Sequence, residues 1–97
     1  MDRMIYLNSL YDIYKDLLTD KQREYYEAYY FDNLSLAEIA ENFDVSRNAV
    51  FNQLKLIEEK IEELESKLKL REKHDKILDI IKNSSDKNLY EKIKRII

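Results

Sequence analysis

The sequence predicts an all-α protein built around a helix-turn-helix. The 97-residue chain contains no glycine and no proline, the two residues that most often end helices. Apolar residues recur at intervals of three and four over most of the chain, as one buried face of a helix requires. Two capping-box patterns mark helix starts. We therefore expect a three- to four-helix core that contains the motif, then a long C-terminal helix and a short terminal helix.

The first two expected helices lie before residue 32. Apolar residues form a wide helical stripe over residues 4–18. Thr19 and Gln22 then form a capping box, in which the hydroxyl accepts from the backbone N–H three residues on and the amide side chain reaches back. This pattern predicts a second helix from about Asp20 to Phe31, followed by a short loop.

Seven of the eight tyrosines fall within the first 30 residues. Aromatic residues at helical spacing usually pack in a core or between helices. Tyrosine is also enriched at the hot spots of protein interfaces. Tyr25 and Tyr29 are four residues apart and share a helix face, so we also consider them as a partner surface.

Residues 35–57 have the pattern of a helix-turn-helix. Ser35 and Glu38 form a second capping box, which predicts a short helix that ends near residues 42–44. Asp44 lies in the turn, where a left-handed conformation is needed and aspartate tolerates it better than most residues. Ser46 is expected to cap the next helix, which begins at Arg47. Small and β-branched residues are expected to fill the space between the two helices, namely Ala40, Val45 and Val50.

The helix that begins at Arg47 carries a heptad seam. The seam consists of Val50, Leu54, Ile57, Ile61, Leu64 and Leu68. It fits either the core of one chain or a coiled-coil dimer. We favour the dimer because the seam is longer than the other helices of the chain can cover. Beyond Leu68 a new apolar stripe starts, offset by two residues, so the helix either bends near residues 68–72 or its halves meet different surfaces. A last helix is expected over residues 87–96, with Leu89, Tyr90, Ile93 and Ile97 on its apolar side.

These expectations divide the chain into two parts. Residues 1–57 form a helical domain that includes the helix-turn-helix at 35–57. Residues 58–97 form a helical extension for oligomerisation. A single core of this size is marginal by itself, so self-association is a natural supplement.

Composition excludes several classes of function. The chain has no cysteine and a single histidine, His74, which excludes disulfides, thiolate metal sites and multi-histidine metal sites. Without glycine it cannot form a Gly-rich phosphate loop, and the carboxylates are scattered over helix surfaces. We therefore expect no enzymatic activity, no metal and no cofactor. No apolar run approaches the ~20 residues of a membrane span, and no secretory signal is seen, so we expect a cytoplasmic protein.

Charge is distributed against the usual pattern of a DNA-binding domain. Residues 19–57 carry 4 basic and 7 acidic residues, a net charge of −3, whereas residues 71–97 carry 8 basic and 5 acidic residues, a net charge of +3. Phosphate neutralisation supplies most non-specific affinity for DNA, so a basic footprint is expected around a recognition helix. The region of the motif lacks one.

The start of the second motif helix nevertheless carries side chains suited to nucleic acid. The candidate contacts are Ser46, Arg47, Asn48, Phe51, Asn52 and Lys55. Arginine pairs with guanine, asparagine pairs with adenine, lysine reaches phosphate, and a phenylalanine can contact the thymine methyl group. Alternatively, Ser46 is only a cap, and Arg47 and Lys55 belong to a solvated face.

Several segments together resemble the YlxM-like family of small bacterial proteins, which is also similar to region 4 of sigma factors. The resemblance spans roughly residues 5–70. It rests on residues 18–22 (LTDKQ), the Tyr29-Tyr30 pair, and residues 35–40 (SLAEIA) followed by Val45-Ser46-Arg47. It implies a winged-helix-like or sigma-like core and a gene neighbourhood beside the signal recognition particle GTPase and its receptor. Relatives often carry a further basic residue after the lysine, where this chain has Leu56, which weakens the case for DNA binding.

Three functions follow as hypotheses. The first is an accessory or regulatory protein of the signal recognition particle pathway, as the resemblance implies, with the GTPase, its receptor or its RNA as partner. The second is a dimeric, sequence-specific DNA-binding regulator. The third is a structural oligomerisation module. A homodimer is expected in each.

Overall fold

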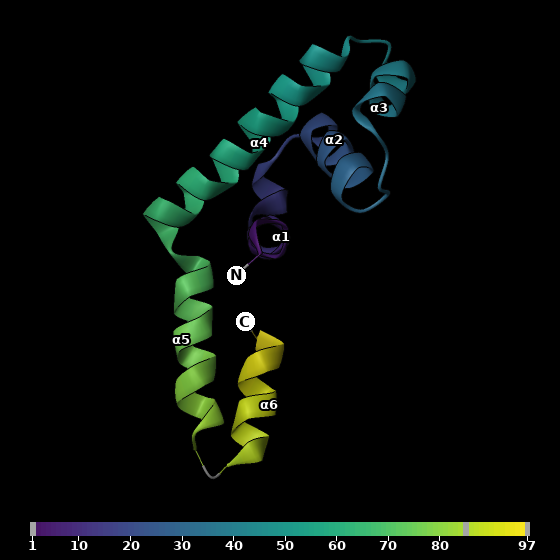
Figure 1. The fold of residues 1–97 in the computed structure, drawn as a ribbon. Coiled ribbons are helices and arrows are strands. Elements are labelled where there is room, and N and C mark those ends of the chain that lie inside the picture. Colours follow the sequence, from purple (N-terminus) through teal and green to yellow (C-terminus); the bar gives the residue numbers. More distant parts are fainter. Residues whose placement is uncertain (1, 85, 97) are drawn as a thin grey trace.

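The computed structural model describes residues 2–84 and 86–96, which form six α-helices and one 3-10 turn and contain no strand (Figure 1). The elements are α1 (Arg3–Tyr14), the 3-10 turn (Lys15–Leu17), α2 (Asp20–Tyr30), α3 (Leu36–Phe43), α4 (Arg47–Leu68), α5 (Leu70–Lys82) and α6 (Lys87–Ile96). The predicted all-α class is confirmed. Ile97, expected on the apolar side of the last helix, lies outside the described residues.

Local hydrogen bonds start the helices where the sequence predicts. The Thr19 hydroxyl accepts from the Gln22 N–H (3.1 Å), and the Thr19 N–H donates to the Gln22 side chain (2.9 Å). Ser35 and Glu38 make the same reciprocal pair, with both bonds at 3.1 Å. The Ser46 hydroxyl accepts from the Ala49 N–H at the start of α4 (3.1 Å). Each cap satisfies backbone donors that have no partner within the helix.

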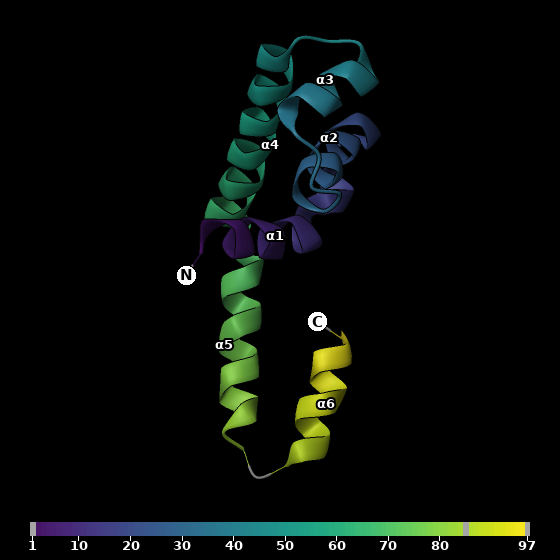
Figure 2. The same ribbon diagram turned by 45° about the vertical axis from the view of Figure 1, so that its right-hand side comes forward.

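The helices form a compact unit with a projecting arm. α4 packs against α1, α2 and α3, which gather along one side of it (Figures 1 and 2). α5 and α6 pair as an antiparallel hairpin beyond the end of α4, and α5 also contacts α1. The extents are 54 × 25 × 24 Å and the radius of gyration is 16.6 Å, against about 12.5 Å for a compact chain of this length. The hairpin therefore extends the molecule considerably.

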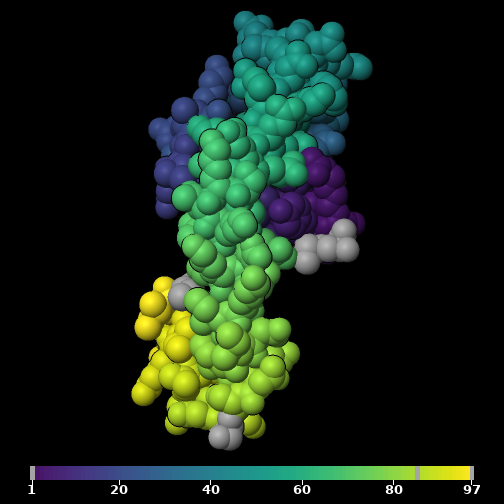
Figure 3. Space-filling model, turned by 90° about the vertical axis from the view of Figure 1, so that its left-hand side faces the viewer, coloured from purple at the N-terminus to yellow at the C-terminus, as the bar shows by residue number. Residues whose placement is uncertain are grey.

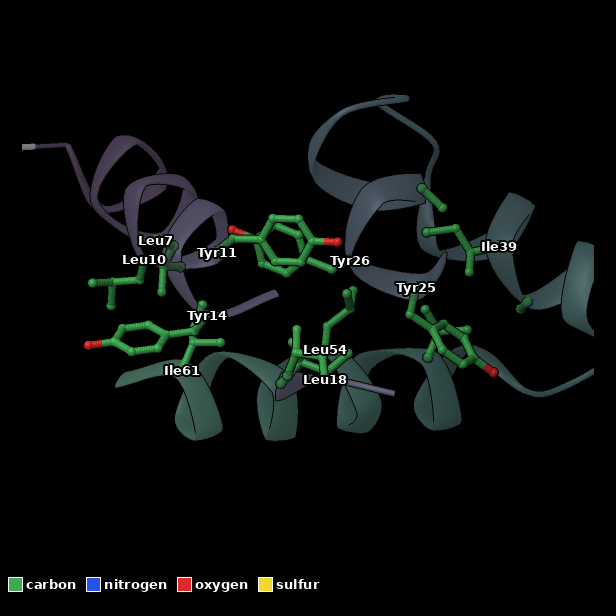
Figure 4. Packing of buried hydrophobic residues seen from close by; sticks show 14 residues of the cluster. Leu7, Leu10, Tyr11, Tyr14, Leu18, Tyr25, Tyr26, Ile39, Leu54 and Ile61 are labelled. Atoms are coloured by element: carbon green, nitrogen blue, oxygen red, sulfur yellow. The ribbon is translucent and has the colours of Figure 1, made fainter. Parts of the chain in front are cut away.

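Tyrosines dominate the core between α1, α2 and α4. The rings of Tyr11 and Tyr26 stack with centroids 4.1 Å apart (Figure 4). Tyr26 also stacks on the partly buried Tyr30 at 4.4 Å. Each of these hydroxyl groups donates a hydrogen bond: Tyr11 to Glu27 (2.8 Å), Tyr26 to Asn8 (2.7 Å) and Tyr30 to Glu58 (2.8 Å). The rings supply apolar area while their polar ends stay satisfied, which buried tyrosine requires.

These buried tyrosines predict a loss of stability in alkali. Burial, helped by hydrogen bonding to carboxylates, raises the pKa of Tyr11 and Tyr30 above the usual range, and burial raises the pKa of Tyr14 to about 12. Below pH ~10 tyrosine is protonated whether the chain is folded or unfolded. Above it the unfolded chain loses protons first, so stability falls as the pH rises through the folded pKa. Urea unfolding should show a midpoint that is flat from about pH 8 to 10 and declines toward pH 12. A Tyr14→Phe variant should show a shallower decline.

The heptad seam of α4 lies mainly inside the chain. Val50, Ile57 and Ile61 are fully buried and Leu54 is nearly so; Leu64 is partly buried against the same cluster, and Leu68 is 42% exposed. The surface that we expected to join two chains is therefore largely the interior of one chain, because α1, α2 and α3 cover it. The core also continues past residue 57, so the expected domain boundary falls within α4.

A hinge separates α4 from α5 where the apolar stripe changes register. Lys69 has a left-handed backbone (φ 54°), which costs a non-glycine residue roughly 1–2 kcal/mol. The Glu65 carboxylate accepts from the Tyr14 hydroxyl (2.6 Å) and from the N–H groups of Arg71 and Glu72 (both 3.1 Å). The Tyr14 hydroxyl accepts in turn from the Leu70 N–H (3.2 Å). Glu65 is one of the carboxylates that we expected on helix surfaces, but it is buried and caps α5.

Candidate nucleic-acid interface

The turn between α3 and α4 has the conformation that the sequence predicts. Asp44 adopts a left-handed backbone (φ 55°), and the Val45 N–H donates to the Ala40 carbonyl (3.0 Å). Asparagine, aspartate and lysine take the left-handed positions because the chain has no glycine. Ile39 and Val50 are both fully buried between the two helices. Val45, which we expected to fill the same space, is 36% exposed, because the turn directs it to the surface.

All six candidate contact residues are exposed on α4 or at its N-cap. The five helical positions are Arg47, Asn48, Phe51, Asn52 and Lys55. At 3.6 residues per turn they share one face of α4, which we call the recognition face. Among the residues that the structure describes, Arg47 and Lys55 have no ion-pair partner within 4.0 Å. The structure therefore leaves these cationic groups available to a ligand.

The charge around this face is nearly balanced. Residues 35–57 carry two basic residues, Arg47 and Lys55, and three acidic ones, Glu38, Glu41 and Asp44, a net charge of −1. All five side chains are exposed. Two cations on the recognition face are few for a duplex contact, which typically neutralises several phosphates. This helix-turn-helix has the shape of a DNA-binding motif but lacks the basic surface that usually surrounds one.

The two tyrosines considered as a partner surface separate. Tyr25 is buried and stacks on Phe43 with centroids 4.5 Å apart, so it is unavailable to a partner. Tyr29 is 38% exposed and meets Tyr30 edge to face. Of this pair, only Tyr29 contributes to the surface.

A hollow of about 380 Å³ adjoins the recognition face. We call it the α2–α4 hollow. Its apolar lining is Tyr29, Tyr30, Leu36, Phe51 and Leu54, and its charged lining is Arg3, Lys55, Glu58 and Glu59. A second hollow next to it shares Tyr29 and Tyr30. The periodicity of α4 did not predict this depression, because four of its nine lining residues come from α1, α2 and the start of α3.

The described residues were also compared with the requirements of a metal site and of a membrane span. Among the described residues, no group of three histidine, cysteine, aspartate or glutamate side chains is placed to hold a metal ion. No helix in the described part of the chain is long and apolar enough to cross a membrane.

The fold and the exposed face of α4 define a helix-turn-helix protein. A model of the family described as "Putative helix-turn-helix protein, YlxM / p13 like" (UPF0122) matches residues 1–96. The chain belongs to this family, as the resemblance implied.

Relatives from several bacteria match over most of their length. The UPF0122 protein of Halalkalibacterium halodurans is 48% identical over 90 residues, covering 90% of this chain and 83% of that protein. The UPF0122 protein of Shouchella clausii is 48% identical over 75 residues, covering 77% of this chain and 69% of that protein. A UPF0122 protein of Bacillus thuringiensis is 39% identical, covering 100% of this chain and 93% of that protein.

Proposed function

We propose that this protein acts by binding rather than catalysis and that it contacts nucleic acid, DNA in the first instance, through the first turns of α4. One observation carries the proposal: the start of α4 presents arginine, asparagine and lysine side chains on one exposed face of a helix-turn-helix. In such motifs the second helix enters the major groove and its N-terminal residues meet base edges. Arg47 and Asn48 are the proposed base readers, and Lys55 is the proposed phosphate contact.

Charge reversal of Arg47 tests this function. We expect Arg47→Glu to weaken binding to genomic DNA fragments at least tenfold at about 50 mM salt, because it removes a favourable contact and places a negative charge against the phosphates. Fluorescence anisotropy titrations at several salt concentrations measure the effect. Lys15→Glu is the matched control, since it changes the net charge equally at an exposed site outside the motif. Absence of wild-type binding at low salt would contradict the proposal.

A role in the signal recognition particle pathway is the second candidate. The resemblance to a family encoded beside the genes of this pathway motivates it, and the distribution of charge favours it. Residues 1–65 carry 7 basic and 15 acidic residues, a net charge of −8, while residues 66–97 carry 10 basic and 5 acidic residues, a net charge of +5. Such a chain offers an acidic surface to a basic protein and a basic arm to RNA or an acidic protein.

Parallel binding assays separate the two candidates. Wild-type protein and Arg47→Glu are offered DNA fragments, the particle's GTPase, its receptor and its RNA under the same conditions. Association with a particle component that survives Arg47→Glu favours the accessory role through another surface. No association with any of these components at physiological salt would exclude that role.

A further inference from the structure

The α5–α6 hairpin leaves apolar side chains uncovered. Ile77 and Leu89 are 39% and 41% exposed, and Ile80 and Ile96 are 73% and 81% exposed. The whole chain exposes 7049 Å², against about 5,900 Å² expected for a compact protein of this mass. The excess of roughly 1,100 Å² is comparable to the area that each partner contributes to a standard protein interface. Figure 3 shows the hairpin as a separate lobe at the end of the molecule opposite α3.

We propose that a second copy of this chain covers this surface, with α6 of each copy docked in the α2–α4 hollow of the other. The choice of a second copy as the partner follows from the distribution of charge along the chain. Residues 70–97, which include the hairpin arm, carry 8 basic and 5 acidic residues, a net charge of +3, whereas residues 1–69 carry 9 basic and 15 acidic residues, a net charge of −6. An exchange of arms therefore places opposite charges together twice. Pairing of two hairpins would cover the aliphatic side chains but would set a net charge of +3 against +3. Nucleic acid would match the charge of the arm but would leave the aliphatic side chains uncovered.

The docking site follows from shape and chemistry. Leu89 and Ile96 are seven residues apart on α6 and therefore point to the same side. A helix that presents apolar anchors at this spacing fits an apolar groove. The aromatic residues Tyr29 and Phe51 and the carboxylates of Glu58 and Glu59 line the α2–α4 hollow. α6 carries lysines and an arginine on its other faces, which are opposite in charge to these glutamates.

The dimer also has a consequence for nucleic-acid binding at α4. That consequence rests on the proposed function. Phe51 and Lys55 belong to both the hollow and the recognition face. A docked α6, which carries Lys92 and Arg95, would add basic side chains of the second copy to the hollow that Phe51 and Lys55 line. The dimer would thereby supply basic residues that the helix-turn-helix lacks in a single chain.

The test measures the mass of the full-length protein without any nucleic acid, so it is independent of the proposed function. Sedimentation equilibrium should give a mass that rises with protein concentration and reaches twice the chain mass of 11.8 kDa by about 100 µM. Phe51→Glu and Ile96→Glu should each raise the dissociation constant at least about tenfold, as expected for truncating or charging an interface anchor. Leu56→Glu is the control, because Leu56 is as exposed as Phe51 (56% and 54%) but lies on another face of α4. Circular dichroism verifies that each variant remains helical.

Mixing the two disabled variants sharpens the test. A Phe51→Glu chain keeps a working arm and an Ile96→Glu chain keeps a working hollow, so their mixture should form a heterodimer through one intact contact. Raising the salt concentration should weaken the wild-type dimer. Two results would overturn the proposal: a monomer at every concentration in the absence of nucleic acid, or a dimer that is insensitive to Phe51→Glu but lost in Ile96→Glu. The second result would indicate pairing between hairpins.

Discussion

Replacing Ile61 with alanine should lower the free energy of unfolding by about 3 kcal/mol, the typical cost of emptying a core isoleucine site. Ile61 is fully buried and lies next to Tyr14 above α4 (Figure 4). Packed helices on both sides of the site limit its collapse, so the lost contacts and the cavity both contribute. Urea unfolding followed by far-ultraviolet circular dichroism measures the change.

Leu68→Ala is the matched control for Ile61→Ala. Both residues belong to the same heptad seam, but Leu68 is 42% exposed and its truncation should cost less than about 1 kcal/mol. If the seam instead joined two chains, both substitutions would weaken association, and the measured stability would depend on protein concentration. Equal losses at the two positions would contradict the packing of the seam within one chain.

The starts of α2, α3 and α4 were predictable because they depend on hydrogen bonds between residues three positions apart. Thr19, Ser35 and Ser46 each satisfy a nearby backbone N–H whatever the rest of the chain does. The left-handed turn at Asp44 has the same local character. Exposure of the candidate contact residues followed from the same periodicity, since the apolar positions of α4 point the other way.

What covers an apolar face was not predictable in the same way. The spacing of Val50, Leu54, Ile57 and Ile61 shows that this face is buried, but the same spacing serves a core and a coiled coil. Only the crossing of α1 and α2 over α4 decides between them, and that crossing depends on contacts far apart in the sequence. The α2–α4 hollow was missed for the same reason.

Glu65 shows the limit of reading charge as exposure. It follows Ile57 and Ile61 at intervals of four, so it shares their buried face. That spacing was the available signal, but a glutamate among other glutamates looked solvated. Burial is tolerated because three donors meet the carboxylate: the Tyr14 hydroxyl and the N–H groups of Arg71 and Glu72.

Glu65→Ala should therefore reduce the free energy of unfolding by roughly 2 kcal/mol, since it leaves buried or partly buried donors without an acceptor. The cap also holds Lys69 in a left-handed conformation and opposes the positive end of the α5 dipole with a negative charge. Without the carboxylate, the first turn of α5 loses its anchor to α1 and α4. We expect the direction of the hairpin to become less fixed as well as the fold to weaken.

Hydrogen exchange distinguishes that local effect from general destabilisation. In Glu65→Ala the amides of Arg71 and Glu72 should lose at least tenfold in protection beyond the loss caused by global unfolding. The amides at the buried centre of α4 should change only by the global amount. Glu63→Ala removes the same charge two residues earlier, from an exposed ion pair with Lys67, and should leave both readouts nearly unchanged. Uniform loss of protection along α4 and α5 would show that Glu65 supports the core as a whole and does not fix the arm.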